Sequence, residues 1–215
     1  MCDRYFLNKN DEYKKKDDGK IVVIEGLDKS GKTTQSRLPY NFYSNNYPGQ
    51  ISLLNFPDYT TRIGKEIELF LHGKVNYTNE VKHILLSANR WEKKPEIEQL
   101  REKNKLLIIN RYYQSNLVYG VANDMNFDWL FNLDKGLPKE DIVIVLDIDP
   151  SISYKRSIDN NFVMDEFEKN ISFLGKVRNA YLNLAKLLNW NVIPAYQSDP
   201  VSIMNSIIKI IHVDK

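Results

Sequence analysis

Cysteine is almost absent from this sequence, which has only Cys2 among its 215 residues. A single cysteine excludes an internal disulfide, and low cysteine usage fits a reducing compartment. Long apolar runs are also missing: no uninterrupted apolar stretch of about 18 residues occurs, so we expect no membrane-spanning helix. The first twenty residues are polar and charged, and we therefore expect no signal peptide there.

A strong excess of positive charge is absent as well. Lys and Arg total 30 and Asp and Glu total 28, which gives a formal net charge of +2. The basic run at positions 14–16 is followed at once by Asp17 and Asp18, which is typical of a solvated segment. Because nucleic-acid binding requires a basic surface, we expect no nucleic-acid partner.

The length and the hydrophobic content of 42% predict one domain with a substantial core. We predict a flexible N-terminal extension over residues 1–19 and a single domain over residues 20–215. Short apolar, β-branched runs predict buried strands at 21–24, 51–56, 106–109, 142–146 and 191–194. Between them, helices are predicted from 33 (with Pro39 disturbing its middle), 63–71, 78–91, 95–103, from 150, 166–188 and 201–211.

This alternation of strands and helices predicts an α/β fold. The expected architecture is three layers, α/β/α, around a parallel five-stranded sheet. Ligands of such sheets bind at the carboxyl ends of the strands. The chemically distinctive segments of the sequence follow predicted strands, so the pattern places them together at this edge.

The first of these segments, residues 26–33, matches the phosphate-binding loop G-x-x-x-x-G-K-[ST] at every fixed position. Its glycines allow backbone N–H groups to surround an anion, and the helix that follows adds a positive dipole. We expect Lys32 to reach the β- and γ-phosphates and the Thr33 hydroxyl to ligate Mg²⁺. The loop alone leaves ATPases, GTPases and nucleotide kinases open.

Further motifs narrow this choice. They are the extended loop at 26–35, Phe-Pro-Asp at 56–58 with the threonines at 60 and 61, the run Ser-Ala-Asn-Arg-Trp-Glu at 87–92, Arg111 and Tyr112 with Ser115, and Gly-Leu-Pro-Lys at 136–139. With these motifs in this order, the chain resembles thymidylate kinase from residue 20 to about residue 211. The resemblance implies a P-loop NTPase fold with a short lid.

The resemblance also implies an activity, cofactors and partners. The expected reaction transfers the γ-phosphoryl group of ATP to dTMP and gives ADP and dTDP, with ATP and Mg²⁺ required. The expected partners are these nucleotides and a second copy of the chain, in a homodimer packed through helices. The implied location is cytoplasmic, with a nuclear pool left open.

Site residues follow from the resemblance by position. Arg90 is expected at the thymine ring, Arg111 at the acceptor phosphate, and Lys29 near the transferring phosphoryl group. The implied catalytic residues are Asp28, Lys29, Lys32 and Arg111. ATP is expected at Gly26, Ser30, Gly31, Lys32, Thr33, Thr34 and Arg156, with Thr33 as the metal ligand. The acceptor is expected at Asp28, Phe56, Tyr59, Leu86, Arg90, Arg111, Ser115, Tyr119 and Phe167.

Alternative interpretations remain for some of these residues. Arg90 and Arg111 could be buried structural arginines paired with carboxylates. Residues 157–170 are expected to form the lid over ATP, and their acidic character favours Lys29 as the catalytic cation. Arg156, just before the lid, could contact phosphate or cap a surface helix.

The chain also departs from the family pattern. Tyr59 stands in place of an arginine, Asn110 in place of an aspartate, Leu86 in place of an aromatic residue and Phe167 in place of a tyrosine. Loss of one charged contact costs on the order of 2–4 kcal/mol of transition-state stabilisation. The departures therefore leave two alternatives open: a catalytically impaired nucleotide-binding relative, or a kinase for another nucleoside monophosphate.

Overall fold

A parallel sheet forms the centre of the computed structural model, which describes residues 18–159, 170–196 and 199–213. In these residues the strands follow the order β2-β3-β1-β4-β5, and every neighbouring pair is parallel. The strands are β1 (Lys20–Gly26), β2 (Ile51–Asn55), β3 (Leu106–Asn110), β4 (Ile142–Asp147) and β5 (Asn191–Pro194). The predicted five-stranded parallel sheet is confirmed.

Burial on both faces explains the continuous apolar runs of the central strands. Residues 21–24 of β1 and 106–109 of β3 are all fully buried. The outer strand β5 has a single buried residue, Ile193. Central strands of a parallel sheet are covered by helices on both faces, so they carry no alternating polar positions.

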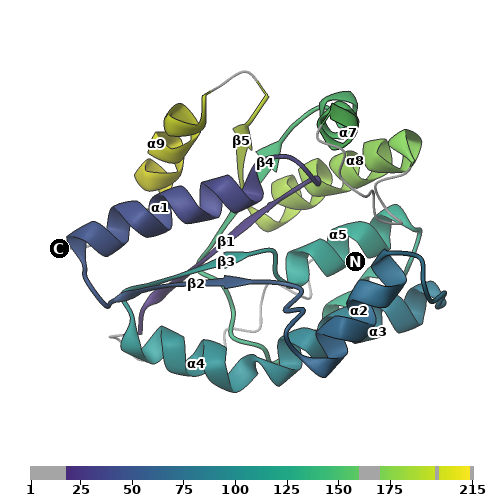
Figure 1. Ribbon diagram of the computed structural model, residues 1–215, viewed down its shortest axis with the longest axis horizontal. Coiled ribbons are helices and arrows are strands. Elements are labelled where there is room, and N and C mark those ends of the chain that lie inside the picture. The colour runs from purple at the N-terminus through teal and green to yellow at the C-terminus, as the bar shows by residue number, and fades with distance from the viewer. Residues whose placement is uncertain (1–17, 160–169, 197–198, 214–215) are drawn as a thin grey trace.

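Two layers of helices cover the sheet (Figure 1). The helices are α1 (Lys32–Asn46), α2 (Arg62–Leu71), α3 (Asn79–Glu92), α4 (Lys94–Lys103), α5 (Tyr113–Ala122), α6 (Phe127–Leu133), α7 (Pro150–Asp159), α8 (Ile171–Leu188) and α9 (Pro200–Ile211). Connections between parallel strands are right-handed, so the strand order fixes the face that each helix covers. Helix α1 lies on one face, where it packs against α9, and helices α4, α5 and α8 lie on the other face. Helices α3 and α6 pack against α5, and α2 packs against α3 rather than against the sheet.

Polar residues begin several of these helices. The hydroxyl of Thr61 accepts a hydrogen bond from the amide of Gly64 at the start of α2, and the Asn170 side chain accepts from the amide of Phe173 at the start of α8. Thr78 accepts from the amide of Val81 at 3.5 Å, which confirms its predicted place before α3. These caps satisfy amides that have no partner within the first turn of a helix.

Some expectations differ from the structure. Helix α1 is continuous through Pro39. Its packing against α9 and the sheet compensates for the one backbone hydrogen bond that proline cannot form. Helices α5 and α6 were not predicted. The predicted start of the long helix at Glu166, and most of the expected lid, lie outside the described residues.

The described part of the chain begins close to the predicted boundary at residue 20. Gly19 already packs on the domain, since its amide donates to the Arg101 carbonyl and a Cβ at this position would lie 1.9 Å from the Asn104 carbonyl oxygen. No helix in the described part of the chain is both long and apolar enough to cross a bilayer.

Candidate active site

The phosphate-binding loop lies between β1 and α1, at the carboxyl edge of the sheet. Gly26 has φ 141° and lies so close to β4 that a Cβ there would be 2.5 Å from the Leu146 carbonyl oxygen. Gly31 has φ 98° and immediately precedes α1. Both glycines are therefore required by the backbone path, and the loop brings amide groups to the start of a helix, where anions bind well.

Lys32 is held inside this loop. Its Nζ donates to the carbonyl oxygens of Gly26 (3.0 Å) and Leu27 (2.6 Å) and lies 3.6 Å from a carboxylate oxygen of Asp28. The next residues, Thr33 and Thr34, are exposed in the first turn of α1. The ammonium group is thus buried within the loop, while the two hydroxyl groups remain accessible to a ligand.

Two side chains of helix α7 donate hydrogen bonds to the backbone of the phosphate-binding loop. The Ser153 hydroxyl donates to the Asp28 carbonyl at 2.6 Å, and Arg156 Nη1 donates to the Lys29 carbonyl at 2.8 Å. Lys29 itself has φ 57°, a conformation that costs a non-glycine residue energy and needs support from its surroundings. Arg156 therefore contacts the phosphate loop and not merely the surface of its own helix.

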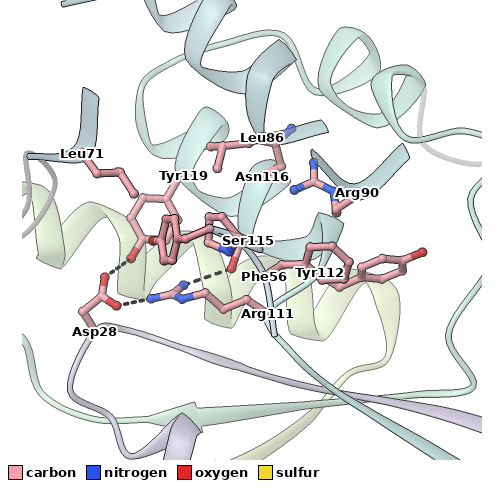
Figure 2. Close-up of a pocket in the computed structure, with 12 residues that line it drawn as sticks. Asp28, Phe56, Leu71, Leu86, Arg90, Arg111, Tyr112, Ser115, Asn116 and Tyr119 are labelled. Carbon is pink, nitrogen blue, oxygen red and sulfur yellow. Dashed lines mark hydrogen bonds and ion pairs between the residues drawn. The ribbon is translucent and has the colours of Figure 1, made fainter. Parts of the chain in front are cut away.

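A pocket opens beside the phosphate loop, and it is lined by the segments that follow β2 and β3, by the end of α2, and by α3 and α5. Figure 2 shows Asp28 and Arg111 at one end of it and Arg90 at the other. Every predicted acceptor residue in the described part of the chain lines this pocket, and Phe167 lies outside the described residues. The lining consists of Asp28, Phe56, Pro57, Tyr59, Leu71, Leu86, Arg90, Arg111, Tyr112, Ser115, Asn116 and Tyr119.

At the phosphate-loop end of the pocket, Arg111 and Asp28 form an ion pair. The Tyr119 hydroxyl donates to the other Asp28 oxygen at 3.0 Å, and Arg111 Nη1 donates to the Ser115 hydroxyl oxygen at 3.1 Å. Burial would raise the pKa of the Asp28 carboxyl, but Arg111 and Lys32 hold it well below its usual value. Asp28 is therefore ionised and joins the loop to the pocket.

The backbone of Arg111 is strained, and a buried carboxylate supports it. Arg111 has φ 62°, and its amide donates to the Ile24 carbonyl. Glu25, fully buried in β1, accepts hydrogen bonds from the amide of Tyr112 (2.9 Å), from the amide and hydroxyl of Ser115 (3.2 and 2.7 Å) and from the Tyr181 hydroxyl (2.8 Å). Strained residues persist where neighbours fix them in this way.

At the opposite end, Arg90 is paired with Asp134, the residue that follows α6. Arg90 Nε donates to Asp134 Oδ1 at 2.9 Å and Nη2 donates to Oδ2 at 2.8 Å, with both side chains almost completely buried. The Ser87 hydroxyl donates to Asp134 Oδ1 at 3.0 Å. Arg90 thus has a structural ion pair and also lines the pocket, so both interpretations of its sequence position hold.

The motif at 87–92 also shapes the loop that carries Tyr59. Asn89 is fully buried, accepts from the Asp58 amide at 2.8 Å and donates to the Asp58 carbonyl and the Thr61 hydroxyl. Gly64 lies against the same loop, where a Cβ would be 1.8 Å from the Asp58 carbonyl oxygen. The loop is therefore fixed, and Tyr59, which is 42% exposed, projects from a rigid support.

The residues at the end of β3 fit a bound divalent cation. Asn110 Nδ2 donates to Asn55 Oδ1 at 3.0 Å, whereas Asn110 Oδ1 is buried without a hydrogen-bond partner among the described residues. No cluster of three or more His, Cys, Asp or Glu side chains that could hold a metal occurs within the described residues. A hydroxyl and an amide oxygen beside the phosphate loop suit Mg²⁺ that takes its other ligands from phosphate and water.

The sequence prediction missed Pro57, Leu71 and Tyr112 of the pocket lining, and also Glu25, Asn116 and Asp134. Glu25 lies within an apolar strand. A carboxylate at such a position needs buried hydrogen-bond donors, so the sequence already indicated that polar groups gather there. Asn116 follows the predicted Ser115, lines the pocket and contacts His83 Nδ1 at 2.6 Å. Asp134 precedes the motif at 136–139, but nothing in the sequence relates it to Arg90, because the contact spans 44 positions.

A phosphate-binding loop beside a pocket that holds two arginines defines a P-loop phosphotransferase of the nucleotide-binding class. The thymidylate kinase family model matches residues 24–207. The thymidylate kinase of Schizosaccharomyces pombe is 39% identical over 142 residues, which is 66% of this chain and 67% of that protein. The Dictyostelium discoideum thymidylate kinase is 32% identical over 180 residues, or 84% of this chain and 79% of that protein.

The solved structure of Candida albicans thymidylate kinase has the same fold. It superposes with a TM-score of 0.77 at 29% identity and covers 90% of this chain and 91% of its own. The chain belongs to the thymidylate kinase family, a group of nucleoside monophosphate kinases. The family resemblance inferred from the sequence is confirmed.

Proposed function

We propose that the protein transfers the γ-phosphoryl group of ATP to dTMP and releases ADP and dTDP. One observation carries the assignment of the site: Asp28 of the phosphate loop is ion-paired with Arg111 of the pocket. Because this pair joins the pocket to the loop that is expected to hold ATP, it supports an acceptor phosphate bound at that end. Family membership and the names of the relatives support the choice of reaction.

The chemistry requires positioning rather than a general base. A monophosphate acceptor is already an anion near neutral pH, so no proton has to be removed before attack. The protein must hold two polyanions in line and neutralise the charge that develops between them. Lys32 and Arg111, at adjacent points of the carboxyl edge, are suited to this task, with Asp28 limiting the net positive charge between them.

Further roles follow from the same geometry. Arg111 would bind the acceptor phosphate, since a guanidinium offers two parallel N–H groups to an anion. Lys29 would approach the transferring group from its strained position in the loop. Thr33 and Asn110 would hold Mg²⁺, directly or through water, and the bound ion supplies neutralising charge at the β- and γ-phosphates.

The opposite end of the pocket would receive the base. Phe56 and Tyr112 pack with ring centroids 5.8 Å apart and form an apolar wall, and Leu86 adds an aliphatic surface. Arg90 and Asn116 add polar groups at this end. A pocket with few convergent polar groups and otherwise apolar walls is typical of a site that orients a planar ligand.

The alternatives receive no specific support. The relatives named above are all called thymidylate kinases, and no observation favours a non-catalytic protein. A different monophosphate remains an outcome for the experiment to detect, since the Candida albicans enzyme is described as having broad substrate specificity.

The proposal extends to a homodimer and to a location. Leu69 on α2 and Val81 and Ile84 on α3 are large apolar residues that are 36%, 37% and 46% exposed, and the two helices pack against each other. A second copy covering this helical face would bury them. Sedimentation of the wild type and of Ile84→Glu would detect such a dimer. The expected cytoplasmic location, with a nuclear pool left open, stays a prediction.

The test of the activity is ADP release from Mg²⁺-ATP in the presence of dTMP, dUMP, dCMP or dGMP. We expect release that depends on dTMP, and a fall of about 10³-fold or more in Lys32→Ala, because the buried ammonium of the loop is lost. Lys186→Ala, an exposed lysine near the end of α8, is the matched control and should retain wild-type turnover.

Two outcomes would contradict the proposal. Absence of ADP release with every monophosphate, in protein that still binds ATP, would indicate a non-catalytic relative. Release with another monophosphate but not with dTMP would indicate a kinase of different specificity.

A further inference from the structure

The pair of Arg90 and Asp134 has the most complete geometry of any ion pair in the pocket. Both carboxylate oxygens are engaged, at 2.9 and 2.8 Å, and the two side chains are 4% and 3% exposed. Ser87 adds a third hydrogen bond to the carboxylate. Side-on pairs of this kind fix a guanidinium in orientation as well as in place.

The pairing leaves Arg90 with one free edge. Its Nε and Nη2 atoms face Asp134, so the N–H groups of Nη1 are directed away from the carboxylate. Figure 2 shows the guanidinium turned toward Leu86 and Asn116 in the pocket. An arginine has N–H donors and no acceptor, so the free edge can only donate.

The pair is also close to electrically neutral as a unit. A buried guanidinium without a carboxylate would attract any anion that entered the pocket, including the phosphate of a nucleotide bound in the reverse direction. With Asp134 in place, the positive excess lies at the other end, where the cations Lys29, Lys32 and Arg111 outnumber the carboxylates Asp28 and Glu25, and Glu25 is fully buried. The pocket is thereby given a polarity: phosphate at one end and a neutral ring at the other.

We propose that Asp134 is a positioning and specificity-determining residue, which aims Arg90 at a carbonyl oxygen of the acceptor base and prevents it from binding phosphate. Arg90 so held accepts a base with a carbonyl at the contacted edge, as in thymine and uracil. It rejects a base with an amino group there, as in cytosine, because two donors would face each other. This inference rests on the proposed function, since it names the selection at the same site.

The experiment compares wild type with Asp134→Asn in kinetics with dTMP and dCMP. Asn retains the shape but offers one acceptor oxygen, so Arg90 loses an engaged partner and its compensating charge. We expect the KM for dTMP to rise about 10- to 10²-fold, with the KM for ATP unchanged. The preference for dTMP over dCMP should fall, and inorganic phosphate should compete with dTMP several-fold more strongly.

A matched control is available in the same chain. Arg178 and Asp147 form a pair of the same side-on geometry, at 2.7 and 2.9 Å, outside the pocket lining. Asp147→Asn should lower thermal stability without altering the dTMP preference or inhibition by phosphate. An equal change of selectivity in both variants would mean that Asp134 has only a structural role.

A second comparison remains informative if Asp134→Asn does not fold. Both Arg90→Gln and the double variant Arg90→Gln/Asp134→Asn remove the buried cation, and the double variant also removes the buried carboxylate that Arg90→Gln leaves unpaired. If Asp134 acts through Arg90, the two variants have the same KM for dTMP and the same selectivity. A further loss in the double variant would overturn the inference.

Failure of the inference is distinguishable from failure of the proposed function. A wild-type protein without dTMP-dependent turnover would refute the proposed function itself. A wild-type protein that phosphorylates dTMP, together with an Asp134→Asn variant of unchanged selectivity and phosphate inhibition, would refute only the role of Asp134.

Discussion

The two ends of the acceptor pocket each contain an arginine paired with an aspartate, but the pairs differ in their surroundings. Arg90 and Asp134 are sealed at 4% and 3% exposure and are satisfied by each other. Arg111 and Asp28 are 16% and 21% exposed, and Asp28 is shared with Lys32 and Tyr119. The base end is thus fixed by a closed pair, whereas the phosphate end has charge available for a ligand.

The departures from the family pattern follow the same division. Tyr59, on the loop after β2, and Asn110, at the end of β3, stand where the resemblance leads us to expect charged residues, whereas Leu86 stands where it leads us to expect another apolar side chain. The supporting structure is intact at both ends, since Asn89 holds the loop of Tyr59 and Glu25 holds the turn of Arg111. The departures at Tyr59 and Asn110 therefore change the expected charge, while the contacts that hold both loops are formed.

Among the changes that test this comparison of the two ends, Arg111→Lys has the largest expected effect, because it breaks the open pair. Lysine keeps the positive charge but lacks the planar guanidinium. The guanidinium contacts Asp28 and Ser115 and at the same time presents N–H groups to the pocket. We expect kcat/KM for dTMP to fall about 10²- to 10³-fold, mainly through kcat. Steady-state kinetics would measure this, and binding of a non-hydrolysable ATP analogue should be unchanged. If the fall were confined to KM, Arg111 would serve only in ground-state binding.

A smaller loss of activity is expected for Glu25→Gln. This change weakens the hydrogen bonds that hold the turn containing Arg111. Glutamine has one acceptor oxygen in place of two, so the amides of Tyr112 and Ser115 and two hydroxyl groups compete for it. We expect kcat/KM to fall about 10- to 10²-fold.

The matched control for Glu25→Gln is Glu140→Gln. Glu140 also accepts a hydrogen bond from a tyrosine hydroxyl, that of Tyr113, but it does not line the pocket. This variant should lower the melting temperature while leaving kcat/KM for dTMP near the wild-type value. Equal kinetic losses in the two variants would show that Glu25 supports the fold rather than Arg111.

Tyr59→Arg is expected to raise activity. The side chain projects into the pocket lining from a loop that Asn89 and Gly64 already fix, so no rearrangement is needed to present a guanidinium. One added charged contact to phosphate should increase kcat/KM for dTMP about 10-fold or more. Tyr59→Phe, which adds no charge, is the control. A decrease in Tyr59→Arg would show that the tyrosine hydroxyl has a role of its own.

Local and short-range features of the fold were predictable from the sequence. The runs at 21–24 and 106–109 are apolar because the central strands are buried on both sides, and the loop at 26–33 is set by its glycines. Helix α6 was missed because its seven residues are too few for a periodic pattern, and α5 because it is buried around most of its circumference.

Long-range partners within the site could not be predicted. Resemblance placed Arg90 and Arg111 in one pocket, and the structure brings them there, but their carboxylates are set by three-dimensional packing. The contact of Arg111 with Asp28 spans 83 positions, and that of Tyr181 with Glu25 spans 156. A single sequence contains no spacing rule for such pairs, so the division into a closed and an open end emerged only with the structure.

Asn110→Asp should strengthen Mg²⁺ binding at the phosphate end by a modest factor. The carboxylate restores a charge beside the phosphate loop, and the Asn55 amide can rotate so that its N–H₂ donates to the new oxygen. We expect the Mg²⁺ concentration for half-maximal turnover to fall several-fold, about threefold to tenfold, with a smaller change in kcat. Asn110→Ser is the control. An unchanged Mg²⁺ requirement would place the ion away from residue 110.

The smallest expected effect is a pH dependence of stability that arises from His83, at the base end of the pocket. His83 lies buried on α3. Its pKa is lowered by burial and by the charges of Arg90 and Lys82, although the Asn116 contact and Asp134 oppose this. Below about pH 6.5 the unfolded chain binds a proton at this histidine that the folded chain disfavours, so stability decreases as pH falls. Asp28 stays ionised over this range and contributes no change.

The measurement is the melting temperature at about pH 7.5 and about pH 5.5, with and without dTMP. His83→Gln keeps a donor toward Asn116 but cannot titrate, so its melting temperature should change less with pH than that of the wild type. If the two proteins lost stability equally on acidification, another group would be responsible. A loss of dTMP binding with acid in the wild type alone would show that His83, through Asn116, links protonation to the base end of the pocket.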